Sequence, residues 1–370
     1  MNLMEADTFY SDTYAVETMD TIYSNDYPIY FENSLNELVK FVEQGNYSRF
    51  FVLTDENTGK YCLPLLKEKF GSMADFDIIE INAGEESKDI DFCIGVWKML
   101  IDFGADRQSL LINLGGGVIS DLGGFVASTF KRGIDFVHVP TTLLSQVDAS
   151  VGGKTGIDID SIKNIIGTFT QPKAVFIEYS FIKTLPERQI LSGLAEMLKH
   201  GLIRDASYWN LLKNSDLKKP AAELIYLSIG IKNKVVIEDP QERGLRKCLN
   251  FGHTIGHAVE TYSLINDEDP LSHGEAIAIG MICEAYLSYK KTGLTESELA
   301  EITEVLSGLY PKYPLKESYN DALYDLMLKD KKNHKEKINC TLLATIGQCS
   351  IDHICAKDEL FESLAYYSNL

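Results

Sequence analysis

Two histidines, His253 and His257, stand four residues apart, and this spacing places both on one face of a helix. The pair resembles a zinc-ligand pair, but the glutamate of the metalloprotease motif H-E-x-x-H is missing, which excludes that class of protease. His273 follows sixteen residues after the pair and opens another apolar helix pattern, and Glu196 lies on an earlier one. One glutamate and two histidines form an accepted catalytic zinc set that leaves a coordination position open. The sequence therefore predicts a metal site, although spacing alone leaves open which of His200, His253 and His257 are ligands.

Cationic side chains stand among glycines and apolar residues in several places, although surface solvation is the usual role of lysine and arginine. Lys154 lies in the stretch Val151–Gly156, whose glycines allow close backbone approach. Its ammonium group is a point charge suited to phosphate. The other cations in such surroundings are Arg132, Lys163, Lys199, Lys232 and Arg246. Together they predict a small polyanionic substrate in a locally positive site.

A glycine-rich stretch connects a strand pattern to a helix pattern. The strand pattern Leu110–Leu114 runs into Gly115–Gly117, and the helix pattern Ile119–Ala127 follows. Glycines at such a junction let a phosphate approach backbone N–H groups at a helix N-terminus. The stretch is not the dinucleotide fingerprint G-x-G-x-x-G, and a tight turn with close helix–sheet packing explains it equally well. Asp55 follows an earlier strand pattern and either contacts a ribose hydroxyl or simply begins a turn.

The composition of the whole chain excludes several classes of protein. Of its 370 residues, 45% are hydrophobic and 24% are charged, which excludes a disordered or fibrous protein. The 35 lysines and arginines against 54 acidic residues give a net charge of −19. So acidic a chain repels phosphate backbones and offers no basic face to an anionic membrane. No apolar run reaches the ~18 residues of a membrane span, so we expect neither a nucleic-acid nor a membrane partner.

The N-terminus and the cysteines indicate a cytoplasmic protein. No lysine or arginine precedes Lys40, whereas targeting peptides are basic. The seven cysteines are an odd number and none has C-x-x-C spacing. We therefore expect core thiols in a reducing compartment rather than a disulfide framework or a thiolate zinc site.

The patterning changes character half-way along the chain. Helical patterns separate strand-length apolar runs in the first half, and one of them places Ile90, Ile94, Trp97 and Ile101 on one helical face. This alternation predicts a parallel α/β sheet. The predicted strands are 49–54, 77–81, 109–114, 136–139 and 174–177. From Leu185 onward most stretches have helical patterns, so we expect an α/β domain over residues 1–183 and a helical domain over 184–370. Residues 1–28 are poorly patterned, and we expect them to be partly frayed.

Ordered sequence blocks give the chain a resemblance to the 3-dehydroquinate synthase family of sugar-phosphate cyclases. The resemblance runs from Arg49 to Gly347. The blocks are GEESK at Gly84–Lys88, GGGVISDLGGFVASTFKRG at Gly115–Gly133, PTTLLSQVDASVGGKTGID at Pro140–Asp158, SGLAEMLKHGLI at Ser192–Ile203, GLRKCLNFGHTIGHAVE at Gly244–Glu260, HGEAIAIGM at His273–Met281 and DKKN at Asp330–Asn333. One departure is Ile162, which stands where many members of the family have glycine.

The resemblance implies a fold, cofactors and a set of site residues. It implies a Rossmann-like NAD-binding α/β domain followed by an all-α domain, with the active site in the cleft between them. The implied metal is Zn²⁺ or Co²⁺, with Glu196, His253 and His273 as ligands. The implied catalytic residues are Glu242, His257 and Lys154. The positions that match NAD contacts are Asp55, Asn57, Glu85, Lys88, Gly116, Gly117, Val118, Asp121, Thr141, Thr142 and Lys163.

The resemblance also implies how substrate and a second subunit are engaged. Members of the family are homodimers, and Arg132 is expected to reach the site of the partner subunit. One of Lys331 and Lys332 is expected to contact substrate. The full set that matches substrate contacts is Arg132, Asp148, Lys154, Asn164, Lys199, Lys232, Arg246, Asn250, Lys331 and Lys332.

The implied reaction converts 3-deoxy-D-arabino-heptulosonate 7-phosphate to 3-dehydroquinate and phosphate, the second step of the shikimate pathway to chorismate and the aromatic amino acids. NAD oxidises a hydroxyl transiently, phosphate is eliminated, the ketone is reduced again, and an intramolecular aldol step closes the ring. The alternatives are a sugar-phosphate cyclase of the 2-deoxy-scyllo-inosose or valiolone type, a glycerol-dehydrogenase-like oxidoreductase, and a non-enzymatic NAD-binding protein. The anion-binding lysines and the intact metal set favour the dehydroquinate synthase reaction.

Overall fold

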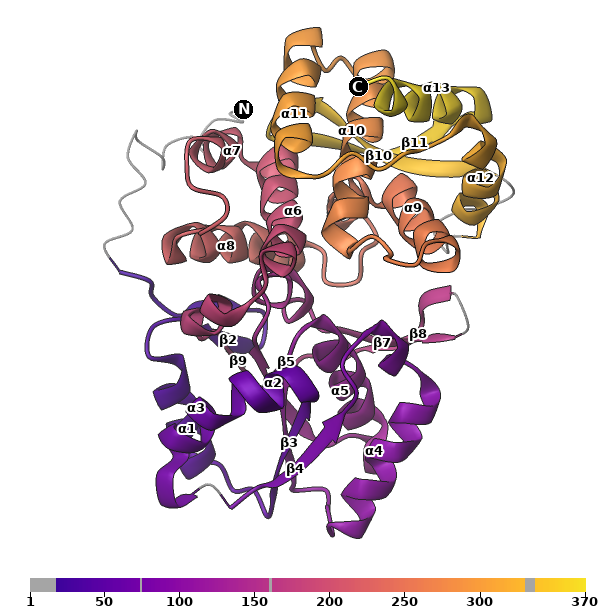
Figure 1. The fold of residues 1–370 in the computed structure, drawn as a ribbon. Helices are drawn as coiled ribbons and strands as arrows, with labels where there is room; N and C mark the ends of the chain where they lie inside the picture. Colours follow the sequence, from indigo (N-terminus) through magenta and orange to yellow (C-terminus); the bar gives the residue numbers. More distant parts are fainter. Residues whose placement is uncertain (1–17, 74, 160–161, 330–336) are drawn as a thin grey trace, which may run out of the picture.

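A seven-stranded, mostly parallel sheet forms the centre of the N-terminal half (Figure 1). The structure, a computed structural model, describes residues 18–73, 75–159, 162–329 and 337–370, so the expected contacts Lys331 and Lys332 lie outside the described residues. The strand order is β1-β2-β9-β6-β5-β3-β4. The strands are β1 (Ile22–Ser24), β2 (Tyr27–Tyr30), β3 (Phe50–Asp55), β4 (Asp77–Ile81), β5 (Leu110–Gly115), β6 (Asp135–Pro140) and β9 (Val175–Phe176).

Helices cover both faces of this sheet, which is why its central strands are continuous apolar runs rather than alternating ones. Every residue of β5 is buried. On one face Val52 and Ile112 pack under α1 (Ser34–Gln44) and α3 (Leu63–Phe70). The opposite face packs under α4 (Ile90–Asp102) and α5 (Gly117–Thr129). The five predicted strands and the α/β class are confirmed.

Helix α4 shows a difference between its predicted and its observed buried face. The helix forms over the predicted residues, and Cys93, Val96 and Leu100 are its buried side chains. The isoleucines of the predicted apolar face remain exposed, Ile94 by 38% and Ile101 by 62%. The helix carries apolar residues on more than one face, so the sequence pattern predicted the helix without predicting which face meets the sheet.

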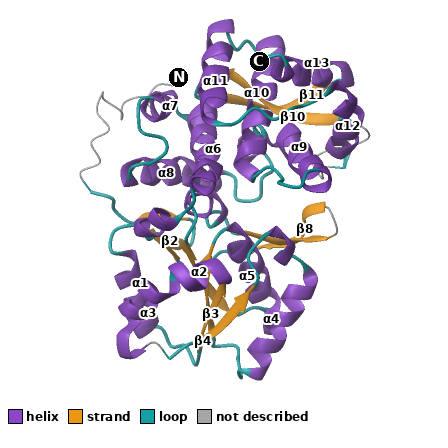
Figure 2. Ribbon diagram, in the orientation of Figure 1, coloured by secondary structure: helices purple, strands orange, loops and turns teal. Residues whose placement is uncertain are grey.

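The C-terminal half is helical apart from one hairpin (Figure 2). Its helices are α6 (Glu187–Arg204), α7 (Ala206–Lys213), α8 (Ala222–Glu238), α9 (His253–Asn266), α10 (His273–Lys291), α11 (Glu296–Leu309), α12 (Asn320–Leu328) and α13 (Lys357–Ser368). The antiparallel hairpin of β10 (Ile338–Thr345) and β11 (Gln348–Cys355) is an addition to the expected all-α domain. Helix α6 is buried along most of its length, and the buried residues include the charged or polar Glu196, Lys199 and His200 as well as its leucines.

Shorter elements connect the two halves and carry several expected site residues. The antiparallel hairpin of β7 (Lys154–Ile159) and β8 (Ile162–Phe169) extends from the sheet half toward α9 (Figure 1). The remaining short elements are α2 (Glu56–Tyr61), η1 (Gly71–Met73), η2 (Glu85–Ser87), η3 (Phe130–Arg132), the π-helical turn η4 (Ser145–Ala149), η5 (Tyr179–Thr184), η6 (Leu245–Asn250) and η7 (Glu317–Tyr319).

The start of the described chain belongs to the sheet. Strand β1 pairs with β2, and β2 pairs with β9, so residues 22–28 are not the frayed end that the sequence predicted. Residues 1–17, the rest of that predicted segment, lie outside the described residues. Tyr27 and Ile29 also pack into the core of the helical half, which their local sequence did not indicate.

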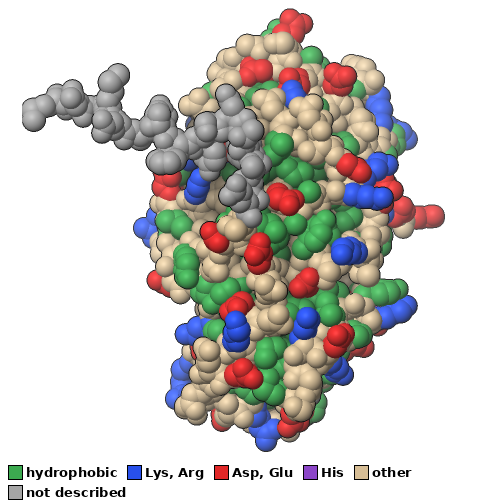
Figure 3. Space-filling model, turned by 90° about the vertical axis from the view of Figure 1, so that its left-hand side faces the viewer, with side chains coloured by type: hydrophobic (Ala, Val, Ile, Leu, Met, Phe, Trp, Pro, Cys, Tyr) green, Lys and Arg blue, Asp and Glu red, His purple; other side chains and the backbone are tan. Residues whose placement is uncertain are grey.

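The cysteines and the surface charges agree with what the composition predicted. None of the seven cysteines, all of them described, forms a disulfide, and all except the half-buried Cys349 are buried. No helix in the described part of the chain combines the length and apolar character that crossing a membrane requires. On the face seen in Figure 3, acidic and basic side chains are interspersed across the described residues.

Candidate active site and metal centre

Three side chains from three helices converge in the C-terminal half. Glu196 on α6 is fully buried, and its Oε1 lies 3.5 Å from Nε2 of His253 and 3.5 Å from Nε2 of His273. His253 is the first residue of α9 and His273 is the first residue of α10. Both oxygens of Glu196 are buried, and Oε2 forms an ion pair with Lys199, which leaves Oε1 facing the two histidines. A carboxylate and two imidazole nitrogens at such distances form a donor set for a divalent cation.

The outward nitrogen of each histidine also faces an acceptor. Nδ1 of His253 lies 3.1 Å from the carbonyl oxygen of Phe251, and Nδ1 of His273 lies 3.4 Å from Oε2 of Glu260. Histidines that bind metal ions almost always donate their second N–H to a carbonyl or carboxylate, which leaves the other nitrogen free to coordinate. The residues present therefore fit the expected zinc or cobalt ion.

Two further groups in the described chain could hold a cation, but they fit less well. Asp148, Glu196 and His200 form one group. His200 is fully buried, with Nδ1 2.8 Å from Ser228 Oγ, and burial lowers its pKa to about 3. The other group joins His257 and His273 through Glu260, but it uses the carboxylate that orients His273. The geometry therefore favours Glu196, His253 and His273 as the metal-binding set.

The charges around this set favour the ionised form of Glu196 and the protonated form of His273. Burial alone would raise the pKa of Glu196, but the ammonium group of Lys199, in direct contact, holds it below its ordinary value. Burial would lower the pKa of His273, but the carboxylates of Glu260 and Glu196 raise it to about 9. Because a metal ligand must be deprotonated, metal binding at this set releases a proton.

A glycine contact between α9 and α10 brings the two histidines together. Gly280 of α10 lies against the backbone of α9, so that a Cβ at this position would lie 2.7 Å from the nitrogen of Gly256 and closer still to the oxygen of Gly252. Gly252 itself has φ +79°, a left-handed conformation that favours glycine, and it is the N-cap of α9. The two helices therefore approach at a distance that no larger residue permits, immediately beside His253.

A buried carboxylate fixes the start of α9. Oε2 of Glu284, a fully buried residue of α10, accepts a hydrogen bond of 2.6 Å from the N–H of Gly252. Its Oε1 accepts bonds of 3.1 and 3.2 Å from the N–H groups of Thr254 and Ile255. A carboxylate at a helix N-terminus satisfies the unpaired N–H groups and interacts favourably with the helix dipole. Glu284 thus positions the first turn of α9, and with it His253.

Several expected anion contacts gather next to the metal-binding set. Lys154, at the start of β7, forms an ion pair with Glu242, whose Oε1 accepts a hydrogen bond of 2.7 Å from Asn250 Nδ2. Lys232 on α8 donates to Oδ1 of Asp148 at 2.7 Å. Burial would raise the pKa of Asp148, but Lys232 and Lys199 lower it below its ordinary value.

Arg246 connects the glycine-containing loop before Lys154 to this cluster. Its Nη1 donates to the carbonyl oxygens of Gly152 at 3.1 Å and Pro240 at 2.8 Å, and the residue is 2% exposed. Gly152 has φ +107°, and a Cβ there would overlap the Arg246 guanidinium. The glycines beside Lys154 thus allow the close approach that the sequence predicted, with an arginine as the group that approaches.

The glycine-rich stretch lies where the strand order of the sheet reverses. The chain passes from β3 to β4 on one side, but from β5 to β6 on the other. Ligands of open α/β sheets bind at the carboxyl ends of the strands at such a switch point. Gly116 and Gly117 lie at this end of β5 and begin α5, where a Cβ on Gly117 would meet only Ala149, at 3.5 Å. This position suits the expected NAD.

Asp55, at the same edge, already has a structural role. It is the N-cap of α2, and its Oδ1 accepts hydrogen bonds of 2.9 Å from the N–H groups of Asn57 and Thr58. The sequence left a ribose contact and a turn residue open for Asp55, and capping is the role that the structure shows. Thr141 and Thr142 follow β6 at the neighbouring strand end.

A chain of charged side chains runs from this edge toward the metal-binding set. Nζ of Lys88 donates to Asp121 at 2.6 Å and to Asn164 at 2.7 Å, and it lies 3.9 Å from Glu85. Burial would lower the pKa of Lys88, but Asp121 and Glu85 raise it above its ordinary value. Lys163 lies 3.6 Å from Glu85, on the side of the hairpin toward α9.

Comparison with known proteins identifies the family. The N-terminal model of 3-dehydroquinate synthase matches residues 78–192, and its C-terminal model matches residues 193–333. A 3-dehydroquinate synthase of Parabacteroides distasonis is 41% identical over 90% of this chain and 95% of its own length. One of Acetivibrio thermocellus is 38% identical over 88% of this chain and 93% of its own. This chain belongs to the 3-dehydroquinate synthase family.

Solved structures show that the fold of the family extends to other reactions. A 2-deoxy-scyllo-inosose synthase complexed with carbaglucose-6-phosphate, NAD⁺ and Co²⁺ is similar with a TM-score of 0.84 and 24% identity, over 93% of this chain and 99% of that one. A 2-epi-5-epi-valiolone synthase of Streptomyces hygroscopicus with NAD⁺ and Zn²⁺ bound has a TM-score of 0.82 and 23% identity, over 99% of each chain. A probable glycerol dehydrogenase of Sinorhizobium meliloti has a TM-score of 0.64 and 15% identity, over 94% of this chain and 97% of that one. These structural similarities confirm the fold, and the reaction must be inferred from the residues of the site.

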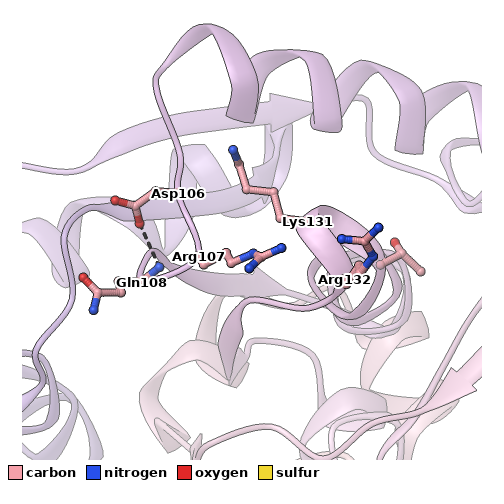
Figure 4. Close-up of a pocket in the computed structure, with 6 residues that line it drawn as sticks. Asp106, Arg107, Gln108, Lys131 and Arg132 are labelled. Carbon is pink, nitrogen blue, oxygen red and sulfur yellow. Dashed lines mark hydrogen bonds between the residues drawn. The ribbon is translucent and has the colours of Figure 1, made fainter.

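One expected residue of this synthase lies away from the others. Arg132 has φ +71° and is exposed in η3, with Lys131 before it at φ +49°. Both line an open pocket of about 930 Å³ together with Asp106, Arg107, Gln108 and Thr129. Figure 4 shows the cationic side chains of Arg107, Lys131 and Arg132 around this pocket. The pocket contains none of the metal-binding residues. Within the described chain, only the site around Glu196 combines metal donors with proton-transfer groups, and we therefore assign the chemistry to that site.

Sequence reasoning missed three residues of the synthase that hold the site together. Glu260 and Gly280 lie inside or at the edge of blocks that carry the resemblance, but no role was predicted for them. Glu284 lies just beyond such a block. Glu284 stands inside the apolar pattern of α10, and this position could have indicated a structural role. An unpaired carboxylate is costly in an apolar core, so a glutamate there needs hydrogen-bond partners.

Proposed function

We propose that this chain is a 3-dehydroquinate synthase that converts 3-deoxy-D-arabino-heptulosonate 7-phosphate to 3-dehydroquinate and phosphate. The observation that carries the proposal is the metal-binding set directly beside a cluster of lysines and an arginine, in a chain of this family. A polyol dehydrogenase needs the metal but has no substrate anion to bind, so the cationic cluster argues against the glycerol-dehydrogenase reaction. In the pathway this reaction is the second step toward chorismate.

The residues of the chain have distinct tasks in this reaction. When bound, NAD supplies a reversible hydride acceptor and Zn²⁺ or Co²⁺ supplies a Lewis acid. We assign the metal to Glu196, His253 and His273, and the NAD site to the strand ends at Asp55 and Gly116. This assignment is supported by the donor geometry and by the switch point of the sheet.

Binding of the substrate falls to the cationic cluster. Lys154, Lys199, Lys232 and Arg246, with Asn250 and Asn164, are the groups proposed to bind its carboxylate and phosphate. Holding an open chain with its ends fixed makes the ring-closing step effectively intramolecular, which contributes up to ~7–11 kcal/mol to lowering a barrier. The substrate is therefore bound as a folded chain with both anions anchored.

Proton transfer falls to His257 and Glu242. The ring of His257 lies 5.0 Å from that of His253 and 5.9 Å from that of His273, centre to centre, one helical turn beyond the first ligand. This position beside the metal-binding set supports a role for His257 in proton transfer. Glu242 is in contact with Lys154 and Asn250, which places its carboxylate among the proposed substrate contacts.

A phosphate-release assay with purified, zinc-loaded protein tests the reaction. Phosphate should be released from 3-deoxy-D-arabino-heptulosonate 7-phosphate, only when NAD is present, and NADH absorbance should not accumulate over many turnovers. The control substrates are glucose 6-phosphate, chosen for its likeness to the carbaglucose-6-phosphate bound by the inosose synthase, and a heptulose 7-phosphate that lacks the carboxylate. Faster release from either control, or NADH formed in proportion to turnover, contradicts the proposal.

We also propose that the enzyme is a homodimer in which Arg132 reaches the partner's site. Exposed apolar residues on α4 lie beside a pocket of about 390 Å³ lined by Trp97, Ile101, Thr129, Phe130 and Lys131. Thr129 and Lys131 line the Arg132 pocket as well, so an apolar surface adjoins Arg132. A second copy of the chain packed on this surface would bury the isoleucines and bring Arg132 to the interface.

Mixing two inactive variants tests this arrangement. Arg132→Ala and Lys154→Met should each lose most activity alone, while a mixed dimer contains one complete site. Random exchange of subunits should restore roughly a quarter of the original activity, because half of the dimers are mixed and one of their two sites is intact. No recovery in mixtures that light scattering shows to be exchanged dimers contradicts the role of Arg132.

The proposed location is the cytoplasm. The seven thiols of the chain are free and six of them are buried, which suits a reducing compartment.

A further inference from the structure

Glu260, whose carboxylate faces Nδ1 of His273, is a charged residue next to the metal-binding set. It lies on α9 seven residues after His253 and three after His257, so the three side chains share one face of the helix. It is 6% exposed. A nearly buried carboxylate needs partners, because an ionised group without them is costly in such a place.

The two oxygens of Glu260 face partners in opposite halves of the molecule. Oε1 accepts a hydrogen bond of 2.7 Å from Nζ of Lys163, which lies on β8 of the hairpin from the sheet half. Oε2 lies 3.4 Å from Nδ1 of His273, the expected metal ligand on α10. In Figure 1 the end of the hairpin lies below α9, and the ion pair joins these two elements. One carboxylate thus joins the strand that carries Lys163 to the helix end that carries a metal ligand.

We propose that Glu260 is a positioning residue that couples metal binding to NAD binding. His273 coordinates through Nε2 only when Nδ1 carries its proton, and Glu260 is the acceptor for that proton. Lys163 holds the same carboxylate in place. The inference rests on the proposed function, because Lys163 is one of the expected NAD contacts.

The coupling follows from the number of donors on Lys163. An ammonium group has three N–H donors, so Lys163 can keep its bond to Glu260 while it contacts a bound nucleotide. A nucleotide that immobilises Lys163 also immobilises Glu260, and a fixed Glu260 orients His273 for the metal. Binding free energies of two ligands are reciprocal, so the metal strengthens NAD binding by the same factor as NAD strengthens metal binding.

Zinc affinity, measured by competition with a coloured chelator with and without saturating NAD, tests the coupling. In the unaltered protein NAD should raise zinc affinity by ~5-fold or more. Glu260→Gln should lower zinc affinity about 10–100-fold even without NAD, as is typical when a residue that orients a metal ligand is replaced. Lys163→Met removes one of the two partners of Glu260, so it should lower the zinc affinity without NAD by less than Glu260→Gln does, and it should abolish the increase caused by NAD.

A matched control comes from another ion pair of the chain. Lys213 lies 2.7 Å from Glu301, and its side chain is 25% exposed, against 2.7 Å and 21% for Lys163. Lys213→Met removes an equivalent pair between α7 and α11, neither residue of which is an expected metal or NAD contact, and should retain the full NAD effect. Thermal unfolding of each variant shows that the protein compared is folded.

The outcomes separate this proposal from the proposed function. An NAD effect that persists in Lys163→Met, or zinc affinity unchanged in Glu260→Gln, overturns the role of Glu260. Failure of the unaltered protein to bind NAD overturns both the coupling and the proposed function. Normal NAD binding and coupling without phosphate release would overturn the proposed function alone.

Discussion

Replacing Gly280 with alanine tests the idea that a single close contact between two helices assembles the metal site. A Cβ at Gly280 would lie 2.7 Å from the backbone nitrogen of Gly256 and nearer still to the carbonyl oxygen of Gly252, whereas Cβ atoms in proteins essentially never approach other atoms within 3.0 Å. The atoms in the way are backbone, so no side chain can rotate to make room. Helices α9 and α10 must therefore move apart by about an ångström.

The size of the effect follows from where the contact lies. His253 directly follows Gly252 on α9, and His273 begins α10, so separation of the helices moves two proposed metal ligands relative to each other. Inserting a methyl group into a well-packed core costs about 1–3 kcal/mol, occasionally more. Misplacing catalytic groups by ~1 Å costs about 10²-fold in rate. We expect Gly280→Ala to melt at a lower temperature, to bind zinc more weakly, and to lose about two orders of magnitude in kcat/KM.

Gly230→Ala is the matched control. Gly230 lies within α8, and a Cβ there would meet no atom within 4 Å. Alanine in an open helical position is favoured over glycine by roughly 0.5–1 kcal/mol, so this variant should melt at the same or a slightly higher temperature. Thermal unfolding, zinc competition and phosphate release are measured on both variants. Gly280→Ala with the zinc affinity and melting temperature of the unaltered protein would refute the reasoning.

Three further predictions concern the metal, Lys154 and the buried His138. A chelator should abolish phosphate release and Zn²⁺ or Co²⁺ should restore it; His253→Ala should lose bound metal by elemental analysis, whereas His257→Ala should keep the metal and lose most activity. Lys154→Met should lower kcat/KM by one to two orders of magnitude, because a charge contact to an anion contributes ~1.5–3 kcal/mol. The NAD affinity and metal content of this variant should stay unchanged. An unaltered kcat/KM would show that Lys154 is a solvated surface residue. Burial lowers the pKa of His138 from 6.5 to about 3, so its neutral form stabilises the fold fully above pH 6.5 and progressively less as the pH falls toward 3. The melting temperature of His138→Gln should therefore decline less between pH 7.5 and 5 than that of the unaltered protein, and an equal decline would contradict this.

The sequence predicts best what depends on local pattern and on residue type. Strands such as β5 and helices such as α6 follow from continuous apolar runs and helical spacing, and both form where expected. The histidine spacing on α9 together with the position of His273 indicates a metal site from residue types and spacing alone. Such features are visible because neighbouring residues in the sequence determine them.

Long-range contacts explain what the sequence could not predict. The buried face of α4 depends on which side meets β-strands that are distant in the sequence, and Ile101 is exposed for that reason. Glu260 owes its role to Lys163, 97 residues away, and Glu284 owes its role to the start of α9, about thirty residues away. No local pattern reports such pairs.

The structure also changes the electrostatic account of the site. The sequence predicted a locally positive site from its lysines, but the fold pairs these lysines with carboxylates. The five ion pairs are Lys88 with Asp121, Lys154 with Glu242, Lys163 with Glu260, Lys199 with Glu196 and Lys232 with Asp148. Pairing is what allows so many charged groups to remain buried or half-buried in an acidic protein, since an unpaired buried charge is far more costly.

This pairing explains why a divalent cation and an anionic substrate suit the same place. The five pairs are neutral as sets, and the positive charge of Arg246 is offset by Glu85, which lies 3.9 Å from Lys88 and 3.6 Å from Lys163. A divalent ion at Glu196, His253 and His273 would add two positive charges, so the excess positive charge would come from the metal rather than from the lysines. In the proposed site the lysines would supply direction and hydrogen bonds, and a bound metal would supply the field that favours a substrate with a carboxylate and a phosphate. An acidic chain can therefore bind a small polyanion without displaying a basic surface to larger ones.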